Sequence, residues 1–190
     1  MENFYDQKFF DEQSAGSIRS ARHIIPILLK TFTVDSVVDV GCGIGTWLCE
    51  FARLGVRNYL GIDGNYIDCK RLLIPQDRFR PTDLAQPFSV GRFDLACSME
   101  VAEHLPGSSA DSFVESLTKS APIVLFSAAI PHQGGVQHVN EQWQSYWAKK
   151  FAAHGYVALD FIRPLVRHNK DVEFWYRQNT LVTAIQKCVR

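Results

Sequence analysis

The feature that most constrains this chain is an apolar run that ends directly in a glycine-rich turn. Residues 37–47 read Val-Val-Asp-Val-Gly-Cys-Gly-Ile-Gly-Thr-Trp, with three glycines at alternating positions. The apolar run predicts a buried strand at 36–40, and the residues after the glycines predict a helix at 46–54. Only glycine lets a backbone bend this sharply between strand and helix and still approach a ligand closely. The start of such a helix also presents free N–H groups to a polar ligand.

The rest of the chain alternates short β-branched runs with longer helix-like stretches, which is typical of a parallel sheet covered by helices. Further strands are expected at 59–62, 93–98 and 122–128, with a short segment closing at Asp83 and an antiparallel pair at 156–162 and 179–186. Further helices are expected at 20–32, 109–120 and 141–154. The predicted fold class is therefore α/β, a Rossmann-like, mostly parallel sheet flanked by helices. A length of 190 residues suits a single domain over 1–190.

Composition narrows the class of partner. Lys+Arg and Asp+Glu both number 20, and this balance argues against nucleic acid as a routine partner, because phosphate binding favours a basic excess. A net charge near zero favours a surface hidden in a homodimer or complex. The five scattered cysteines include no C-x-x-C pair, so reduced thiols in a cytoplasmic protein are the expectation. No apolar run is long enough to span a membrane.

The stretch 1–20 is interpreted as an N-terminal lid or as surface packing.

Three acidic residues follow predicted strands and complement the glycine turn. Asp39 stands two positions before the first glycine, where it would repel a pyrophosphate but attract a cationic ligand. Asp63 ends the second strand, about 20 residues past the glycines, where a carboxylate can accept both ribose hydroxyls. Asp83 could accept from a base amino group while Leu84 covers the ring, although an Asp at this place also serves as a turn residue or helix N-cap.

These residues resemble the class I S-adenosylmethionine (SAM)-dependent methyltransferases, and the resemblance covers the chain from about Tyr5 to the last strand. That family has a seven-stranded sheet, in agreement with the predicted alternation. The resemblance implies that SAM is the cofactor and that its methionine end lies against Asp39, Gly41, Gly43 and Gly45. It further implies that Asp63 holds the ribose and that Asp83, Leu84 and Met99 surround the adenine.

A second cluster follows the fourth predicted strand. If the turn after it is helical, Glu100, Glu103 and His104 share one face, which would suit Mg²⁺ or Mn²⁺. This E-x-x-E-H turn resembles metal-dependent family members, including ubiquinone-pathway O-methyltransferases and small-RNA 3′-terminal methyltransferases, which also carry a later histidine. The resemblance implies that His138 is the fourth ligand. Two alternatives stay open: the turn merely braces the loop, or His104 or His138 acts as a general base.

The loop 131–143 is dense in hydrogen-bonding side chains and is followed by aromatic residues. Such a loop, backed by Trp143, Tyr146 and Trp147 at helical spacing, could hold a sugar or polyol. The alternative for these aromatic residues is core packing, which is expected for at least Trp147. The stretches 138–143 and 176–180 resemble bacterial methyltransferases of surface-polysaccharide or secondary-metabolite pathways. The predicted function is methyl transfer from SAM to a hydroxyl of a small molecule. The alternatives are a SAM-fold protein without methyl transfer, whether running another reaction or non-catalytic, and RNA as a disfavoured acceptor.

Overall fold

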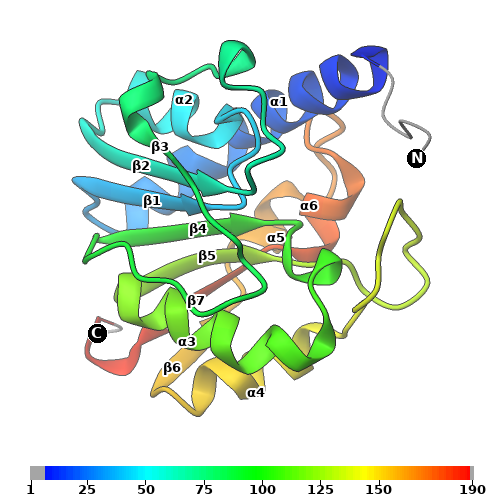
Figure 1. Cartoon of the computed structure of the whole chain (residues 1–190). Helices are drawn as coiled ribbons and strands as arrows, with labels where there is room; N and C mark the ends of the chain where they lie inside the picture. The colour runs from blue at the N-terminus through cyan, green and yellow to red at the C-terminus, as the bar shows by residue number, and fades with distance from the viewer. Residues whose placement is uncertain (1–6, 189–190) are drawn as a thin grey trace.

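A computed structural model describes residues 7–188 of the chain (Figure 1). Residues 1–6, where the expected lid begins, lie outside the described residues. The strands are β1 (Ser36–Val40), β2 (Asn58–Asp63), β3 (Phe79–Pro81), β4 (Leu95–Met99), β5 (Ile123–Ser127), β6 (Tyr156–Leu159) and β7 (Leu181–Ile185). The α-helices are α1 (Gln7–Thr31), α2 (Thr46–Arg53), α3 (Ala110–Ser120), α4 (Gln144–Ala152), α5 (Ile162–Val166) and α6 (Phe174–Asn179).

The seven strands form one sheet in the order β3-β2-β1-β4-β5-β7-β6. The pairs from β3 to β5 are all parallel, whereas β7 runs antiparallel to both of its neighbours. The predicted fold class, including the antiparallel pair at the C-terminal end, is confirmed. The short βα connections between parallel strands require helices on both faces of such a sheet.

Each face of the sheet has its own hydrophobic core, because successive side chains of a strand point to opposite faces. In β1, Val37 packs with α1, α2 and α5 on one face. Its neighbour Val38 packs with α3 and α4 on the other face. Trp147 of α4 is 2% exposed and lies in the second core, as expected. Figure 1 shows the sheet between these two helical layers.

The carboxyl ends of the parallel strands define the edge where the site lies. The strand order reverses between β1 and β4, and open α/β sheets bind ligands outside the carboxyl ends at such a reversal. The glycine turn leaves β1 at this point, and the E-x-x-E-H turn leaves β4 beside it. In Figure 1 the loop 131–143 and α6 gather beyond the same edge.

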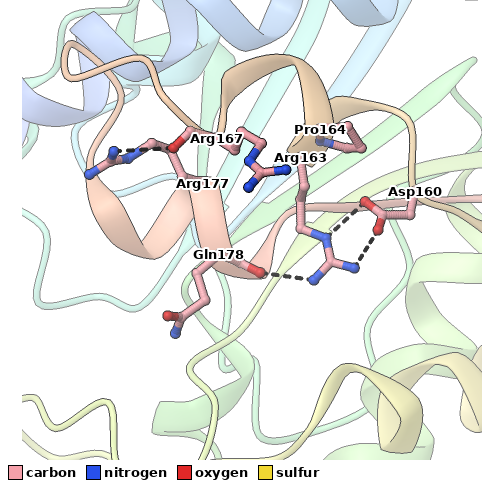
Figure 2. A pocket seen from close by; sticks show the side chains of 6 residues that line it. All are labelled: Asp160, Arg163, Pro164, Arg167, Arg177 and Gln178. Carbon is pink, nitrogen blue, oxygen red and sulfur yellow. Dashed lines mark hydrogen bonds and ion pairs between the residues drawn. The ribbon is translucent and has the colours of Figure 1, made fainter.

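Several elements differ from the predicted bounds. The first helix begins at Gln7 rather than at residue 20, and Gly16 within it lets the Glu173 side chain pack closely, since a Cβ there would lie 2.5 Å from its carboxylate. The fourth helix begins at Gln144 rather than 141, because loop contacts hold residues 141–143. The last strands are shorter than expected, and α5 and α6, seen close up in Figure 2, occupy the segment between them. Every helix within 7–188 is too short or too polar to cross a membrane.

Candidate active site

The glycine turn has the geometry that its sequence predicts. Gly41, Gly43 and Gly45 have φ angles of +81°, +54° and +89°, in the left-handed region where glycine is favoured. The backbone N–H of Gly41 donates to the Ile62 carbonyl at 2.8 Å, which ties the turn to the end of β2. A Cβ on Gly41 would lie 2.3 Å from Cγ2 of Val101, so the turn after β1 packs directly on the turn after β4.

Asp63 ends β2 with a buried carboxylate that faces the glycine turn. Its Oδ2 accepts the Gly43 N–H at 2.7 Å, and its Oδ1 accepts the Gly64 N–H at 2.6 Å. The Tyr66 hydroxyl also donates to Oδ1, at 2.5 Å, although the Tyr66 side chain is largely exposed. The structure therefore brings Asp63 and the glycine turn together, as the sequence predicts, and places a hydroxyl donor on the carboxylate.

Asp39 is buried beneath the same turn. It is 2% exposed, and no described residue donates a hydrogen bond to its Oδ2. Its pKa is raised to about 8, first by burial and then by the charge of Asp63, while a hydrogen bond from the Cys97 thiol acts in the opposite direction. A carboxylate in this condition gains stability when a cationic group comes close. Asp39 therefore suits a positively charged ligand and opposes an anionic one.

The three residues expected around an adenine lie at the ends of β3 and β4. Met99 ends β4 and is buried, as is Leu84. Asp83 is exposed and its Oδ1 accepts the Ala85 N–H at 3.0 Å, which is the turn role that its position also predicted. The Thr82 N–H donates to the Asp63 carbonyl at 2.7 Å and fixes this segment beside Asp63, the residue expected to bind the ribose.

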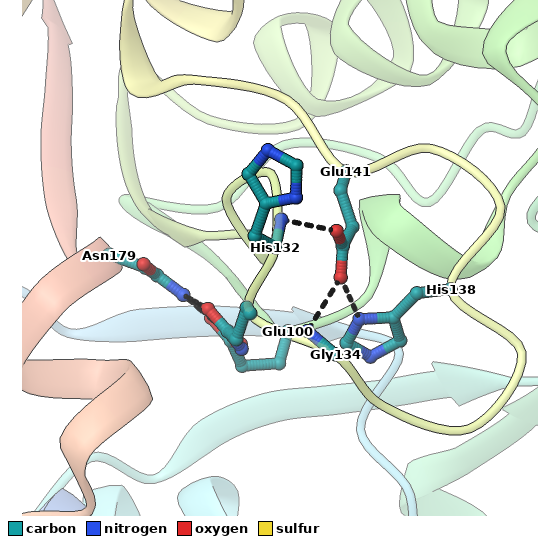
Figure 3. A network of polar contacts seen from close by, with 7 residues as sticks. Glu100, His132, Gly134, His138, Glu141 and Asn179 are labelled. Carbon is teal, nitrogen blue, oxygen red and sulfur yellow. Dashed lines mark hydrogen bonds and ion pairs between the residues drawn. The ribbon is translucent and has the colours of Figure 1, made fainter.

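The E-x-x-E-H turn departs from the expected helical face. A 3₁₀ turn spans Ala102–His104, and Glu100 lies before it with a φ of +57°. The Glu100 carboxylate accepts from Gln133 Nε2 at 3.0 Å and from Asn179 Nδ2 at 3.1 Å (Figure 3). Of the three residues expected on one face, only Glu103 and His104 lie in a helical turn, so the expected helical face that includes Glu100 is wrong, and two amides hold the Glu100 carboxylate instead.

Three of the four expected metal ligands come together. Ligand atoms of Glu103, His104 and His138 all lie within 4.8 Å of one another. Glu103 is fully buried and neither carboxylate oxygen has a hydrogen-bond partner within 7–188. Burial, and then the charge of Glu100, raise its pKa well above the usual value. The cluster therefore consists of two imidazoles beside a buried carboxylate that receives no hydrogen bond from the described residues.

The two imidazoles differ in their surroundings. Their rings meet edge to face, with centroids 4.8 Å apart. His104 is exposed, and desolvation followed by the charge of His138 lowers its pKa. His138 is mostly buried, and its Nδ1 lies 3.1 Å from Glu141 Oε1 (Figure 3). His138 is thus oriented by a carboxylate, while His104 faces the solvent.

Glu141 organises the loop 131–143. Its carboxylate accepts the backbone N–H groups of His132 at 2.9 Å and Gly134 at 3.0 Å, in addition to the His138 contact (Figure 3). Burial alone would raise its pKa, but these hydrogen bonds outweigh it and lower the pKa. His132 lies at a φ of +72°, which this bonding holds in place. The hydrogen bonds of Glu141 therefore give the loop a defined conformation, which positions His138 at the site.

Gln133, Glu141 and Asn179 are site residues whose roles sequence reasoning did not identify. Asn179 is 1% exposed and also donates to Gln133 Oε1, at 2.8 Å, so it joins α6 to the loop and to Glu100. The only sequence signal for these residues is their position in polar stretches. Their partners are distant in the chain, and no local pattern indicates them.

Comparison with known proteins agrees with this fold. A family model described as a methyltransferase domain matches residues 10–167. The tocopherol O-methyltransferase of Arabidopsis thaliana is 36% identical over 97 residues, which cover 46% of this chain and 27% of that protein. The chain thus spans about a quarter of the length of the curated relatives it matches.

Solved structures share the fold at low sequence identity. Magnesium protoporphyrin IX methyltransferase of Synechocystis PCC 6803 with bound SAM has a TM-score of 0.65 and 16% identity, covering 96% of this chain and 85% of that one. The methyltransferase domain of a bacterial Hen1 protein has a TM-score of 0.62 and 18% identity, covering 88% and 96%. Because the family model matches most of its length, the chain belongs to the methyltransferase domain family, in its class I, SAM-dependent form.

Proposed function

We propose that this chain transfers the methyl group of SAM to a hydroxyl of a small molecule. The observation that carries the proposal is the direct packing of the glycine turn on the turn that holds Glu103 and His104, through Gly41 and Val101. This contact supports the proposal that a cofactor bound at the glycine turn lies beside a cluster of acid–base groups, at the reversal point of the sheet. A methyl donor and a hydroxyl acceptor must meet in line, and the proximity of the two turns suits that need.

The cofactor half of the proposal rests on charge and on backbone shape. The unpartnered oxygen of Asp39 suits the cationic methionine end of SAM, and the glycines keep the turn free of Cβ atoms. Asp63 would accept the ribose hydroxyls after the Tyr66 hydroxyl leaves Oδ1. Met99 and Leu84 provide the apolar surface for the adenine.

The acceptor half rests on the two imidazoles and on Trp143. In the proposed reaction the acceptor oxygen attacks the methyl carbon, and the C–S bond breaks with its electron pair remaining on sulfur. When no cation is bound at the cluster, the hydroxyl proton passes to the exposed imidazole of His104, while Glu141 and His138 hold that ring in place. Trp143 is 55% exposed at the end of the loop and offers an indole face for a ring of the acceptor, such as a sugar, a polyol or a secondary metabolite.

A divalent cation fits the same cluster. The carboxylate of Glu103 has no other partner within the described chain, and two imidazoles lie within reach of the same point. Glu103, His104 and His138 would hold the ion, with Mg²⁺ or Mn²⁺ as the candidates. When bound, the ion would act as a Lewis acid that lowers the pKa of an acceptor hydroxyl. Glu100, bound to Gln133 and Asn179, would support this group from beside it.

The test is formation of S-adenosylhomocysteine (SAH) and methylated product from SAM with a panel of hydroxylated small molecules, with Mn²⁺ and with chelator. His104→Gln should lower turnover by about 10²-fold or more, since that is the usual contribution of a general acid–base group. His154→Gln, at an exposed histidine on the far side of α4, is the matched control. SAH binding without any methylated product would favour a SAM-fold protein that has lost methyl transfer. Full activity of His104→Gln would reject its role, and equal activity with chelator and with Mn²⁺ would reject the metal.

A further inference from the structure

A basic hollow lies on the segment between β6 and β7, outside the cluster described above. It has a volume of about 350 Å³ and is lined by Asp160, Arg163, Pro164, Arg167, Arg177 and Gln178 (Figure 2). Three guanidinium groups and one carboxylate line it, so two positive charges are left over. Guanidinium groups are the usual recognition element for phosphate and carboxylate.

One side of the hollow is closed by an internal ion pair. Arg163 donates two hydrogen bonds to the Asp160 carboxylate, from Nε to Oδ1 at 2.8 Å and from Nη2 to Oδ2 at 2.5 Å. Its remaining nitrogen donates to the Gln178 carbonyl at 3.0 Å. Figure 2 shows this pair on one side and Arg167 and Arg177 on the other. All three nitrogens of the Arg163 guanidinium therefore already donate hydrogen bonds within the protein, and Arg163 lines the hollow without being free to bind a ligand.

The other two arginines are not neutralised. Within residues 7–188, neither Arg167 nor Arg177 has a carboxylate partner. Arg177 makes one long bond, 3.4 Å from Nη1 to the Arg167 carbonyl, and its Nε is buried without a partner. The nearby acids are turned away, since Asp171 lies near His23 and Glu173 binds Arg19. Two guanidinium groups without a carboxylate partner give the hollow an excess of positive charge, which favours an external anion.

The hollow adjoins the proposed acceptor site. The Gln178 carbonyl that receives Arg163 also receives Gln144 Nε2 at 3.0 Å, and Gln144 begins α4 directly after the loop 131–143. The next residue, Asn179, binds Glu100 beside the imidazole cluster. Gln178 and Asn179 are consecutive residues, so the wall of the hollow and the contact to Glu100 are neighbours at the end of α6.

We propose that this hollow binds an oxyanionic group, a phosphate or a carboxylate, carried by the acceptor. The part of the proposal that concerns the acceptor rests on the proposed function, whereas the anion site itself does not. The substrate class is then a small molecule with a hydroxyl at one end and a phosphate or carboxylate at the other. Arg167 and Arg177 fix the charged end, and the hydroxyl is thereby directed toward His104.

The probes are inorganic phosphate and acetate, titrated at constant ionic strength into ¹⁵N-labelled protein and followed by NMR. Saturable changes in chemical shift are expected at the Gln178 amide and at the arginine Nε–H groups. The anion that binds more tightly, phosphate or acetate, indicates which of the two groups the acceptor carries. Arg167→Gln should weaken that binding at least tenfold. Because Arg167 is exposed, this variant should keep the fold. Arg57→Gln, at an exposed arginine elsewhere, is the control and should bind as the wild type does.

An SAH titration on the same samples separates this proposal from the proposed function. SAH binding with no saturable anion binding, or with anion binding unchanged in Arg167→Gln, would overturn the hollow as a site and leave the function standing. Anion binding with no SAH binding would overturn the function and support the hollow. In turnover, phosphorylated or carboxylated acceptors should show a KM at least tenfold higher in Arg167→Gln with kcat little changed. An equal KM would overturn the link to the acceptor.

Discussion

The two halves of the site are built in different ways. The methionine and ribose part of the cofactor half comes from one continuous stretch, residues 39–66, in which hydrogen bonds from the backbone N–H groups of Gly41 and Gly43 tie the glycine turn to the end of β2. The acceptor half joins separate segments: the turn after β4, the loop 131–143 and Asn179 of α6. The first depends on backbone conformation, and the second depends on buried side-chain contacts over long distances. The two halves should therefore respond differently to mutation.

The largest effect should come from Gly41, where the two halves touch. Gly41→Ala forces a Cβ against Val101 at a positive φ and should lower the free energy of unfolding by about 3 kcal/mol or more. Gly43→Ala, with a positive φ but no atom within 4 Å of the added Cβ, should cost about 1–2 kcal/mol. Urea denaturation of both variants measures the difference. Equal losses would contradict a tight contact between the two turns.

This contrast also explains how far the sequence could predict the molecule. The glycine turn, Asp39 and Asp63 were correctly brought together because their spacing and their strands are local features. The mostly parallel sheet followed from the alternation of elements, and the antiparallel pair at the C-terminal end was predicted with it. The position of Glu100 could not be predicted, because its left-handed backbone depends on the amides of Gln133 and Asn179.

Next in size is the effect of Glu103 on metal binding. Glu103→Gln removes the only carboxylate of the three-residue cluster and should weaken Mn²⁺ binding by about 100-fold. Glu100→Gln is the matched control, and its effect should be smaller because its carboxylate is bound by amides. Electron paramagnetic resonance of free Mn²⁺ provides the measurement. A larger loss of Mn²⁺ affinity in Glu100→Gln would contradict a metal site at Glu103 and the two histidines.

The pH dependence of stability tests the cofactor half. Asp39 has a pKa of about 8 in the folded chain and 3.8 as the reference for the unfolded chain, so the folded state binds more protons between these values. The free energy of unfolding should therefore fall as pH rises from about 4 to about 8, by at most about 1.4 kcal/mol per pH unit from this group. Asp39→Asn should remove this slope in urea titrations. An unchanged slope would assign the proton to another group.

The smallest effect is expected at Tyr66. Its hydroxyl occupies Asp63 Oδ1, the position proposed for a ribose hydroxyl. Tyr66→Phe should therefore raise SAH affinity about threefold, in line with the loss of one competing hydrogen bond. Tyr59→Phe, on β2, is the control, because its ring lies against the Arg78 guanidinium instead. A weaker affinity in Tyr66→Phe would mean that the tyrosine holds the cofactor instead of competing with it.

The most direct test of the central claim is calorimetric titration of SAH into the wild type and Asp63→Asn. Asp68→Asn, at an exposed aspartate that caps a short turn nearby, is the control. The account predicts saturable binding of one SAH per chain in the wild type and in Asp68→Asn, with a loss of at least about tenfold in Asp63→Asn. Absence of binding in the folded wild type, or equal affinity in Asp63→Asn, would contradict the assignment of the glycine turn and Asp63 as the cofactor site.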